Sequence, residues 1–211
     1  MGLEITPHHK QALATWLGTG SINIFGAPFA GKDTQGARLA ELFHTTLLGG
    51  GDILRNSVVP EHVKVIMEEG AFIPTKDYIE IVLPYLSHPK FADKPLILSA
   101  VGRWHGEEPG VLEATTRSKH PLKAVIYMDI NEDLVWQRWH AHKLIGNRGA
   151  RKDDAKEALA ARHKEFLQKT PKVIEFYRDM GILIEVDGSL APNEAFDDIV
   201  KKLDQLAMLA S

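Results

Sequence analysis

The sequence contains no cysteine among its 211 residues. This absence excludes disulfide bridges and metal sites built from thiolates, and it is typical of proteins in a reducing compartment, so we expect a cytoplasmic location. The first twenty residues lack the basic segment and apolar run of a secretory signal. Because no apolar run reaches the 18 residues of a membrane span, we also expect no membrane partner.

The chain carries little net charge. Its 25 basic and 28 acidic side chains leave a formal charge of −3, which provides no general attraction for nucleic acid or for an anionic membrane. We therefore expect no nucleic-acid partner. Apolar residues make up 44% of the sequence, which is enough to fill the core of one α/β domain of this length. We expect a single domain over residues 1–211 and a monomer.

Short apolar runs alternate with longer amphipathic segments, a pattern typical of βαβ units around a parallel sheet. Pro171 favours a first helical turn, so separate helices are expected at 154–168 and 171–179. Asn131 is expected to cap the helix that follows it. The pattern predicts an α/β fold, a doubly wound five-stranded parallel sheet with helices on both faces. The expected strands are 21–25, 45–48, 95–99, 124–130 and 182–186, and the other helices lie near 33–43, 61–69, 76–87, 109–118, 132–143 and 192–209.

Residues 26–35, GAPFAGKDTQ, carry the frame of a phosphate-binding loop with one change. Gly26, Gly31 and Lys32 match G-x-x-x-x-G-K, but Asp33 stands where the motif has Ser or Thr. The loop follows an apolar strand and opens a helix, where backbone N–H groups and the helix dipole attract phosphate. We therefore predict a P-loop that binds the phosphates of a nucleotide, through Gly26, Ala27, Pro28, Phe29, Ala30, Gly31, Lys32, Asp33 and Thr34.

Four segments downstream of the loop are equally informative: GGGDILRN (49–56), MEEGAFIPTKDYIEIV (67–82), PLILSAVGR (95–103) and RKDDAKEALAARHKEF (151–166). They resemble the G-D-x-L-R motif, the G-x-L/I-V/I-P segment that leads into a helix, the strand ending in D-G-F-P-R, and the R-x-D-D-x(7)-R run of the adenylate kinase family of nucleoside monophosphate kinases. The loop is similar to that family's G-x-P-G-x-G-K-G-T-Q. The five pieces occur in family order over about residues 21–209.

The resemblance implies a phosphotransferase that moves the γ-phosphoryl group of ATP to a nucleoside monophosphate, with Mg²⁺ as the cofactor. It implies a core of residues 21–48, 93–141 and 155–211, a monophosphate-binding segment of about 49–92 and a short lid of about 142–154. The lid has no cysteine, so we expect no zinc.

Phosphoryl transfer needs no protein nucleophile, because it depends on positioning and on neutralising charge. Positively charged side chains are therefore the expected catalytic residues. The resemblance assigns this role to Lys32, Arg103, Arg138, Arg151 and Arg162. It places the acceptor monophosphate among Gly50, Asp52, Arg55, Ala71, Phe72, Ile73, Arg103 and Glu107.

Two departures from the family pattern concern magnesium. The acid that holds the ion through water at the end of the third strand falls on Ser99, and Asp33 is new at a position where related loops present a hydroxyl group. We hypothesise that Asp33 compensates for Ser99 by offering a carboxylate to the same ion from the opposite side. The alternative is that Asp33 is an acid at a helix N-terminus, stabilised by the helix dipole. Phe29 also replaces a glycine of the family loop.

The acceptor base is less well defined. Glu107 stands near the position of the glutamine that reads adenine, and Glu108 is an equally near candidate. An ionised glutamate only accepts hydrogen bonds, which suits guanine or cytosine better than N1 of adenine. AMP is the first expectation by family frequency, and GMP, CMP or a deoxynucleotide are the alternatives. A small-metabolite kinase and a catalytically weak ATP-binding regulatory protein are the other functions that the sequence leaves open.

Overall fold

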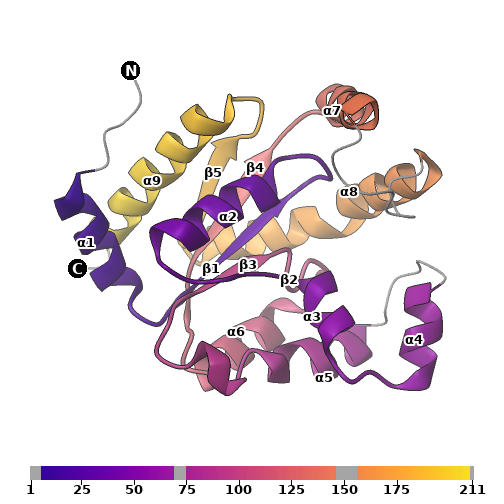
Figure 1. Ribbon diagram of the computed structural model, residues 1–211, viewed down its shortest axis with the longest axis horizontal. Coiled ribbons are helices and arrows are strands. Elements are labelled where there is room, and N and C mark those ends of the chain that lie inside the picture. The colour runs from indigo at the N-terminus through magenta and orange to yellow at the C-terminus, as the bar shows by residue number, and fades with distance from the viewer. Residues whose placement is uncertain (1–5, 69–74, 146–155, 210–211) are drawn as a thin grey trace.

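The computed structural model describes residues 6–68, 75–145 and 156–209. Within these ranges the chain forms a parallel five-stranded sheet in the order β2-β3-β1-β4-β5 (Figure 1). The strands are β1 (Ser21–Gly26), β2 (Leu47–Gly49), β3 (Leu96–Ser99), β4 (Leu122–Asp129) and β5 (Leu183–Asp187). The helices are α1 (Pro7–Leu17), α2 (Lys32–Leu42), α3 (Gly50–Asn56), α4 (Glu61–Glu68), α5 (Thr75–Tyr85), α6 (Glu108–Arg117), α7 (Glu132–Ile145), α8 (Lys156–Asp179) and α9 (Pro192–Leu209), with a 3₁₀ turn at Pro89–Phe91.

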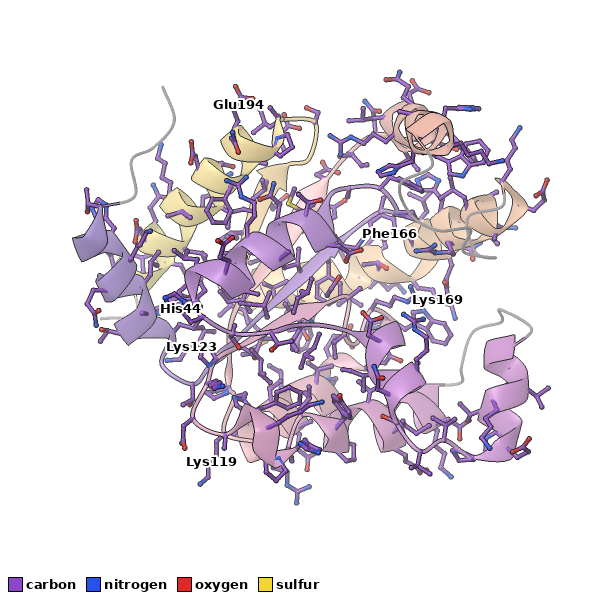
Figure 2. The ribbon with its side chains drawn as sticks, viewed as in Figure 1. His44, Lys119, Lys123, Phe166, Lys169 and Glu194 are labelled. Atoms are coloured by element: carbon purple, nitrogen blue, oxygen red, sulfur yellow. The ribbon has the colours of Figure 1, made fainter. Side chains whose placement is uncertain are left out.

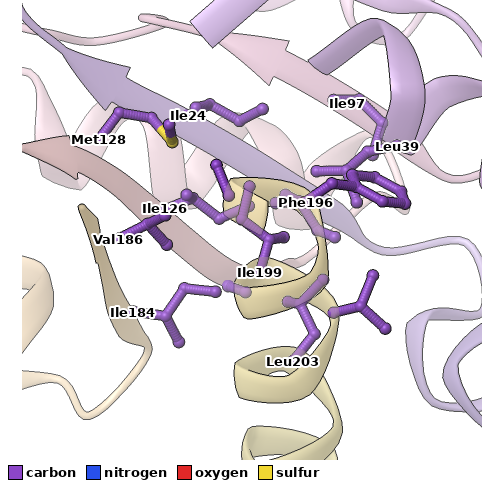
Figure 3. Close-up of a cluster of buried hydrophobic side chains, with 14 of the residues drawn as sticks. Ile24, Leu39, Ile97, Ile126, Met128, Ile184, Val186, Phe196, Ile199 and Leu203 are labelled. Carbon is purple, nitrogen blue, oxygen red and sulfur yellow. The ribbon is translucent and has the colours of Figure 1, made fainter. Parts of the chain in front are cut away.

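Helices cover both faces of the sheet, as predicted. Ile22 and Ile24 of β1 pack in the cluster formed with α1, α2 and α9, whereas Phe25 packs on the opposite face with Val173 of α8. This alternation follows from the period of two along a strand. Figure 3 shows side chains of α9 and of β4 and β5 in the first cluster, among them Ile126, Met128, Ile184, Val186, Phe196, Ile199 and Leu203.

The structure corrects the prediction of separate helices at 154–168 and 171–179. Lys156–Asp179 form the single helix α8, and Pro171 lies inside it. An internal proline removes one helical hydrogen bond and costs about 3 kcal/mol. Val173 and Ile174, which follow it, are buried against the sheet. Tertiary packing therefore outweighs the local preference for a break.

Two other details compare directly with the sequence prediction. Asn131 caps α7 as predicted, because its Oδ1 accepts a hydrogen bond from the Leu134 N–H at 2.9 Å. Helix α3 was not predicted, since its first residues are glycines with low helix propensity. Among the described residues, no helix is both long enough and apolar enough to cross a membrane.

The register of the sheet brings two loops and the start of α3 to one edge. Ile24 of β1 lies opposite Ser99 of β3, and Gly49 of β2 also lies opposite Ser99. The strands are parallel, so the loops that follow β1 and β3 and the helix that follows β2 leave the sheet side by side. In open α/β sheets this carboxyl edge is the usual place for a ligand.

Candidate active site

The loop after β1 ends at the N-terminus of α2. Gly31 has a φ of +97°, a left-handed angle that favours glycine, and it occupies the N-cap position of the helix. The Ala30 N–H donates to the Ala27 carbonyl at 3.1 Å, and the Lys32 ammonium donates to the same carbonyl at 2.8 Å. The lysine charge is therefore held across the loop, beside the N–H groups that open the helix.

Phe29 adopts a φ of +62°, which is unusual for a bulky side chain. Its carbonyl accepts a hydrogen bond from Arg138 Nη1 at 3.1 Å. Its ring packs against the buried cluster that includes Val135 and Trp139 of α7, and it lies 5.6 Å from the ring of His142. The phenylalanine that replaces the family glycine thus fixes the loop to α7.

Arg138 bridges two loops at this edge. Besides its bond to Phe29, its Nη2 donates to the Gly188 carbonyl at 2.7 Å. Gly188 follows β5, and a side chain there would lie 2.4 Å from Ile130 Cγ2. The guanidinium of Arg138 therefore joins the loop after β1 to the loop after β5. Its assignment to the transferred phosphate stays a prediction.

The structure brings together the two candidates for the magnesium site. Ser99 Oγ donates to Asp33 Oδ1 at 3.1 Å, and Ser99 is buried whereas Asp33 is exposed. Because the two oxygens touch, they lie beside each other, and not on opposite sides of a shared ion. Among the described residues, no group of three or more His, Asp or Glu side chains is arranged to hold a metal.

Asn23 supports the loop after β3, a role that the sequence analysis did not assign. It is fully buried in the central strand. Its Nδ2 donates to the Val101 carbonyl at 2.7 Å, and its Oδ1 accepts from the Val101 N–H at 3.3 Å. A polar residue inside an otherwise apolar strand needs such partners, so its position in SINIF was the available signal.

The same loop carries Arg103. Gly102 before it has a φ of +68°, and a side chain there would lie 2.2 Å from Val111 Cγ2, so only glycine fits. The Arg103 carbonyl accepts a hydrogen bond from Thr170 Oγ1 at 3.2 Å, and Arg103 Nη2 lies 3.6 Å from Glu165 Oε2. Helix α8 thus positions both the backbone and the guanidinium of Arg103.

Glu107 and Glu108 are buried, and both carboxylates turn into their own loop. Glu107 Oε2 accepts from the backbone N–H of Trp104 at 3.1 Å, and Glu108 Oε2 accepts from the Gly106 N–H at 2.6 Å. Burial raises the pKa of Glu107 to about 7, against the opposing effects of the Trp104 hydrogen bond and the Arg103 charge. These contacts give both acids a structural role. The role of Glu107 in reading a base stays a prediction.

Replacing Glu107 with glutamine should change how stability depends on pH. The folded state holds this proton up to about pH 7, whereas an unfolded glutamate loses it near pH 4.3. The wild type therefore loses stability from this group as pH rises between these values, and the loss is complete above pH 7. We expect the free energy of unfolding of Glu107→Gln, relative to wild type, to rise by about 1–3 kcal/mol across that window. Urea unfolding of both proteins at pH 5, 6, 7 and 8 measures this difference, and a constant difference would contradict the prediction.

The predicted acceptor residues after β2 lie in α3. Gly50 is buried at its start, and Arg55 Nη2 forms an ion pair with Asp52 Oδ1 at 2.5 Å on the exposed side. Arg162 is half-buried on α8, where its charge lowers the pKa of Glu165. The predicted residues Ala71, Phe72, Ile73 and Arg151, and most of the predicted lid, lie outside the described residues.

The chain can now be compared with known proteins. The family model for adenylate kinase matches residues 24–182. The chain belongs to the adenylate kinase family. It is 27% identical over 191 residues to the UMP-CMP kinase of Homo sapiens, covering 86% of this chain and 95% of that protein. It is also 27% identical to the adenylate kinases of Thermotoga petrophila and Kosmotoga olearia, over 208 and 215 residues, covering 84% and 88% of this chain and 94% and 100% of those proteins.

Membership of the adenylate kinase family confirms the resemblance and the expectation of a phosphotransferase. The parallel sheet with helices on both faces agrees with the P-loop kinase fold that was predicted. The relatives named above are kinases of nucleoside monophosphates, and they differ in the acceptor that their names give.

Proposed function

We propose that the chain transfers the γ-phosphoryl group of ATP to a nucleoside monophosphate, with AMP as the first acceptor. The observation that carries this proposal is the shared edge of β1, β2 and β3. It gathers the loop with Lys32, the helix with Arg55 and the loop with Arg103 at the carboxyl ends of neighbouring strands.

Each part of this edge has a distinct role in the proposed reaction. The loop Gly26–Thr34 and the N-terminus of α2 hold the phosphates of ATP, and Lys32 neutralises their charge. Arg55 and Arg103 bind the phosphate of the acceptor. Arg138, Arg151 and Arg162 stabilise the charge on the group in transfer. No covalent bond to the protein is needed, because the two nucleotides react directly once they are aligned.

We propose Mg²⁺ as the partner of ATP, held beside Asp33 and Ser99. Mg²⁺ is usually bound through one or two carboxylates together with substrate phosphates and water. One carboxylate and one hydroxyl group whose oxygens lie 3.1 Å apart fit this donor set. When bound, the ion would neutralise charge on the phosphates of ATP.

The acceptor base is the least constrained part of the proposal. Since the carboxylates of Glu107 and Glu108 bond to backbone N–H groups, they do not favour guanine or cytosine in this arrangement. AMP agrees with the adenylate kinases among the relatives, and CMP or UMP agrees with the UMP-CMP kinases. GMP and deoxynucleotides are the remaining candidates.

A coupled assay with ATP, Mg²⁺ and a panel of AMP, CMP, UMP, GMP and dAMP tests the proposal. We expect turnover with AMP to exceed that with every other acceptor by at least about tenfold, the order of discrimination that a few base contacts provide. Faster turnover with CMP or UMP would overturn the choice of AMP and keep the reaction class. Absence of turnover across the panel, with ATP binding retained in calorimetry, would instead favour a regulatory ATP-binding protein.

A further inference from the structure

A group of four side chains joins α8 to the loop after β3. It consists of Arg103 and Trp104 from the loop, and Glu165 and Lys169 from the helix, and we name it the Trp104 cluster. Lys169 Nζ lies 3.8 Å from the centre of the Trp104 ring. Figure 2 shows Lys169 extending from α8 toward the side of the molecule that carries α3 and α4.

The charges of the Trp104 cluster act on each other. Arg103 Nη2 lies 3.6 Å from Glu165 Oε2, and Lys169 follows Glu165 by one helical turn. Burial raises the pKa of Glu165, while Arg103, Lys169, a hydrogen bond from Trp104 and Arg162 lower it. The same two cations, Arg103 and Lys169, also lower the pKa of Glu107. Both cations therefore face one region, although they come from different elements.

The contact between Lys169 and the indole ring is easily exchanged. A cation over an aromatic face at an exposed site is held weakly compared with an ammonium group bonded to a phosphate oxygen. The backbone of Trp104 is anchored, because its main-chain N–H donates to Glu107 Oε2. The ring thus holds the exposed Lys169 ammonium close to Arg103 without occupying its hydrogen-bond donors.

We propose that Lys169 binds the phosphate of the acceptor monophosphate together with Arg103. This inference rests on the proposed function, which places that phosphate at Arg103. Arg103 and Lys169 bring two positive charges, and Glu165 offsets one of them. The remaining net charge of +1 attracts the phosphate of a nucleoside monophosphate, which is a dianion near neutral pH. Lys169 therefore determines the affinity for the phosphate and not for the base.

The experiment compares Lys169→Met with wild type. Methionine removes the charge and keeps an unbranched side chain that still packs on an aromatic ring. We expect the KM for the preferred monophosphate to rise about tenfold, with the KM for ATP and the melting temperature unchanged. In calorimetry, the monophosphate should bind about tenfold more weakly to the variant, whereas its nucleoside, which lacks the phosphate, should bind both proteins equally. Lys169→Arg should restore most of the affinity.

The controls separate this inference from the proposed function. Lys201→Ala removes an exposed lysine from α9, which covers the other face of the sheet, and it should change neither KM. If wild type binds monophosphates and Lys169→Met binds them equally well, the inference is wrong and the proposed function stands. An equal rise in the KM for ATP would also overturn it. If wild type binds none of the five monophosphates, both proposals are wrong.

Discussion

Replacing Lys32 with alanine is expected to lower kcat/KM for phosphoryl transfer by at least about 100-fold, the scale reported for removing one group that stabilises developing charge. The Lys32 ammonium lies at the N-terminus of α2, within hydrogen-bond distance of the Ala27 carbonyl. It can therefore move from the loop carbonyl to a phosphate oxygen without leaving the site. The coupled assay measures the loss, and calorimetry with ATP shows how much of it is lost binding.

A second variant separates the charge from the support of the loop. Lys32→Ala removes both the ammonium and its bond to Ala27, whereas Lys32→Gln keeps a side chain that can donate to that carbonyl. We expect both variants to lose activity to a similar extent, because the charge acts on the phosphates. Near-normal turnover by Lys32→Gln would show that the lysine only supports the loop.

Replacing Asp33 with asparagine is expected to raise the Mg²⁺ concentration needed for half-maximal turnover by about tenfold, since a carboxylate binds this hard cation much better than an amide does. The same change should strengthen the binding of ATP in the absence of metal, because it removes a negative charge near the phosphates. Asparagine keeps an oxygen that can accept the bond from Ser99. Coupled assays at a series of Mg²⁺ concentrations measure the first effect, and calorimetric titrations of ATP without Mg²⁺ measure the second.

A compensating substitution makes the magnesium prediction sharper. Ser99 Oγ lies 3.1 Å from Asp33 Oδ1, so a carboxylate at position 99 would occupy nearly the same place. We expect Asp33→Asn combined with Ser99→Asp to recover most of the response to Mg²⁺. If Asp33→Asn alone leaves the metal dependence and the metal-free binding of ATP unchanged, Asp33 serves only as an acid at the N-terminus of α2.

The sequence predicted the elements that have a clear local pattern of apolar and polar residues. Each strand was placed within about two residues, because buried apolar runs bounded by turn residues are distinctive. Helix α3 was not predicted because it begins with Gly50 and Gly51, which have low helix propensity. Burial of Ile53 and Leu54 stabilises the helix in the fold. Pro171 led to a wrong prediction of a helix start for a related reason, because packing against the rest of the fold decides whether α8 continues through it.

The site was predictable only in part. Asp33 lies in the first turn of α2, just after β1, and Ser99 ends the neighbouring strand β3, so the pairing of these strands brings the two residues together. The resemblance had already indicated both positions as candidates for the magnesium site. The partnership of Arg103 with Glu165 was not predictable, because it joins segments that are far apart in the sequence. The inward direction of Glu107 was not predictable either, because it depends on the conformation of its own loop, where the Trp104 backbone N–H donates to it. No residue pattern signals such a contact without the fold.

The strand order has a consequence for synthesis on the ribosome. The strand that precedes the predicted phosphate-binding loop, β1, pairs with β3 and β4 and not with β2. Of these two neighbours β3 is synthesised first, and the chain must grow by about 70 residues beyond β1 before the first residue of β3 is made. At about 5–20 residues per second this takes ~4–14 s. The loop acquires its first supporting strand only when nearly half of the 211-residue chain has been made, so ATP can stabilise only nascent chains that have passed this length.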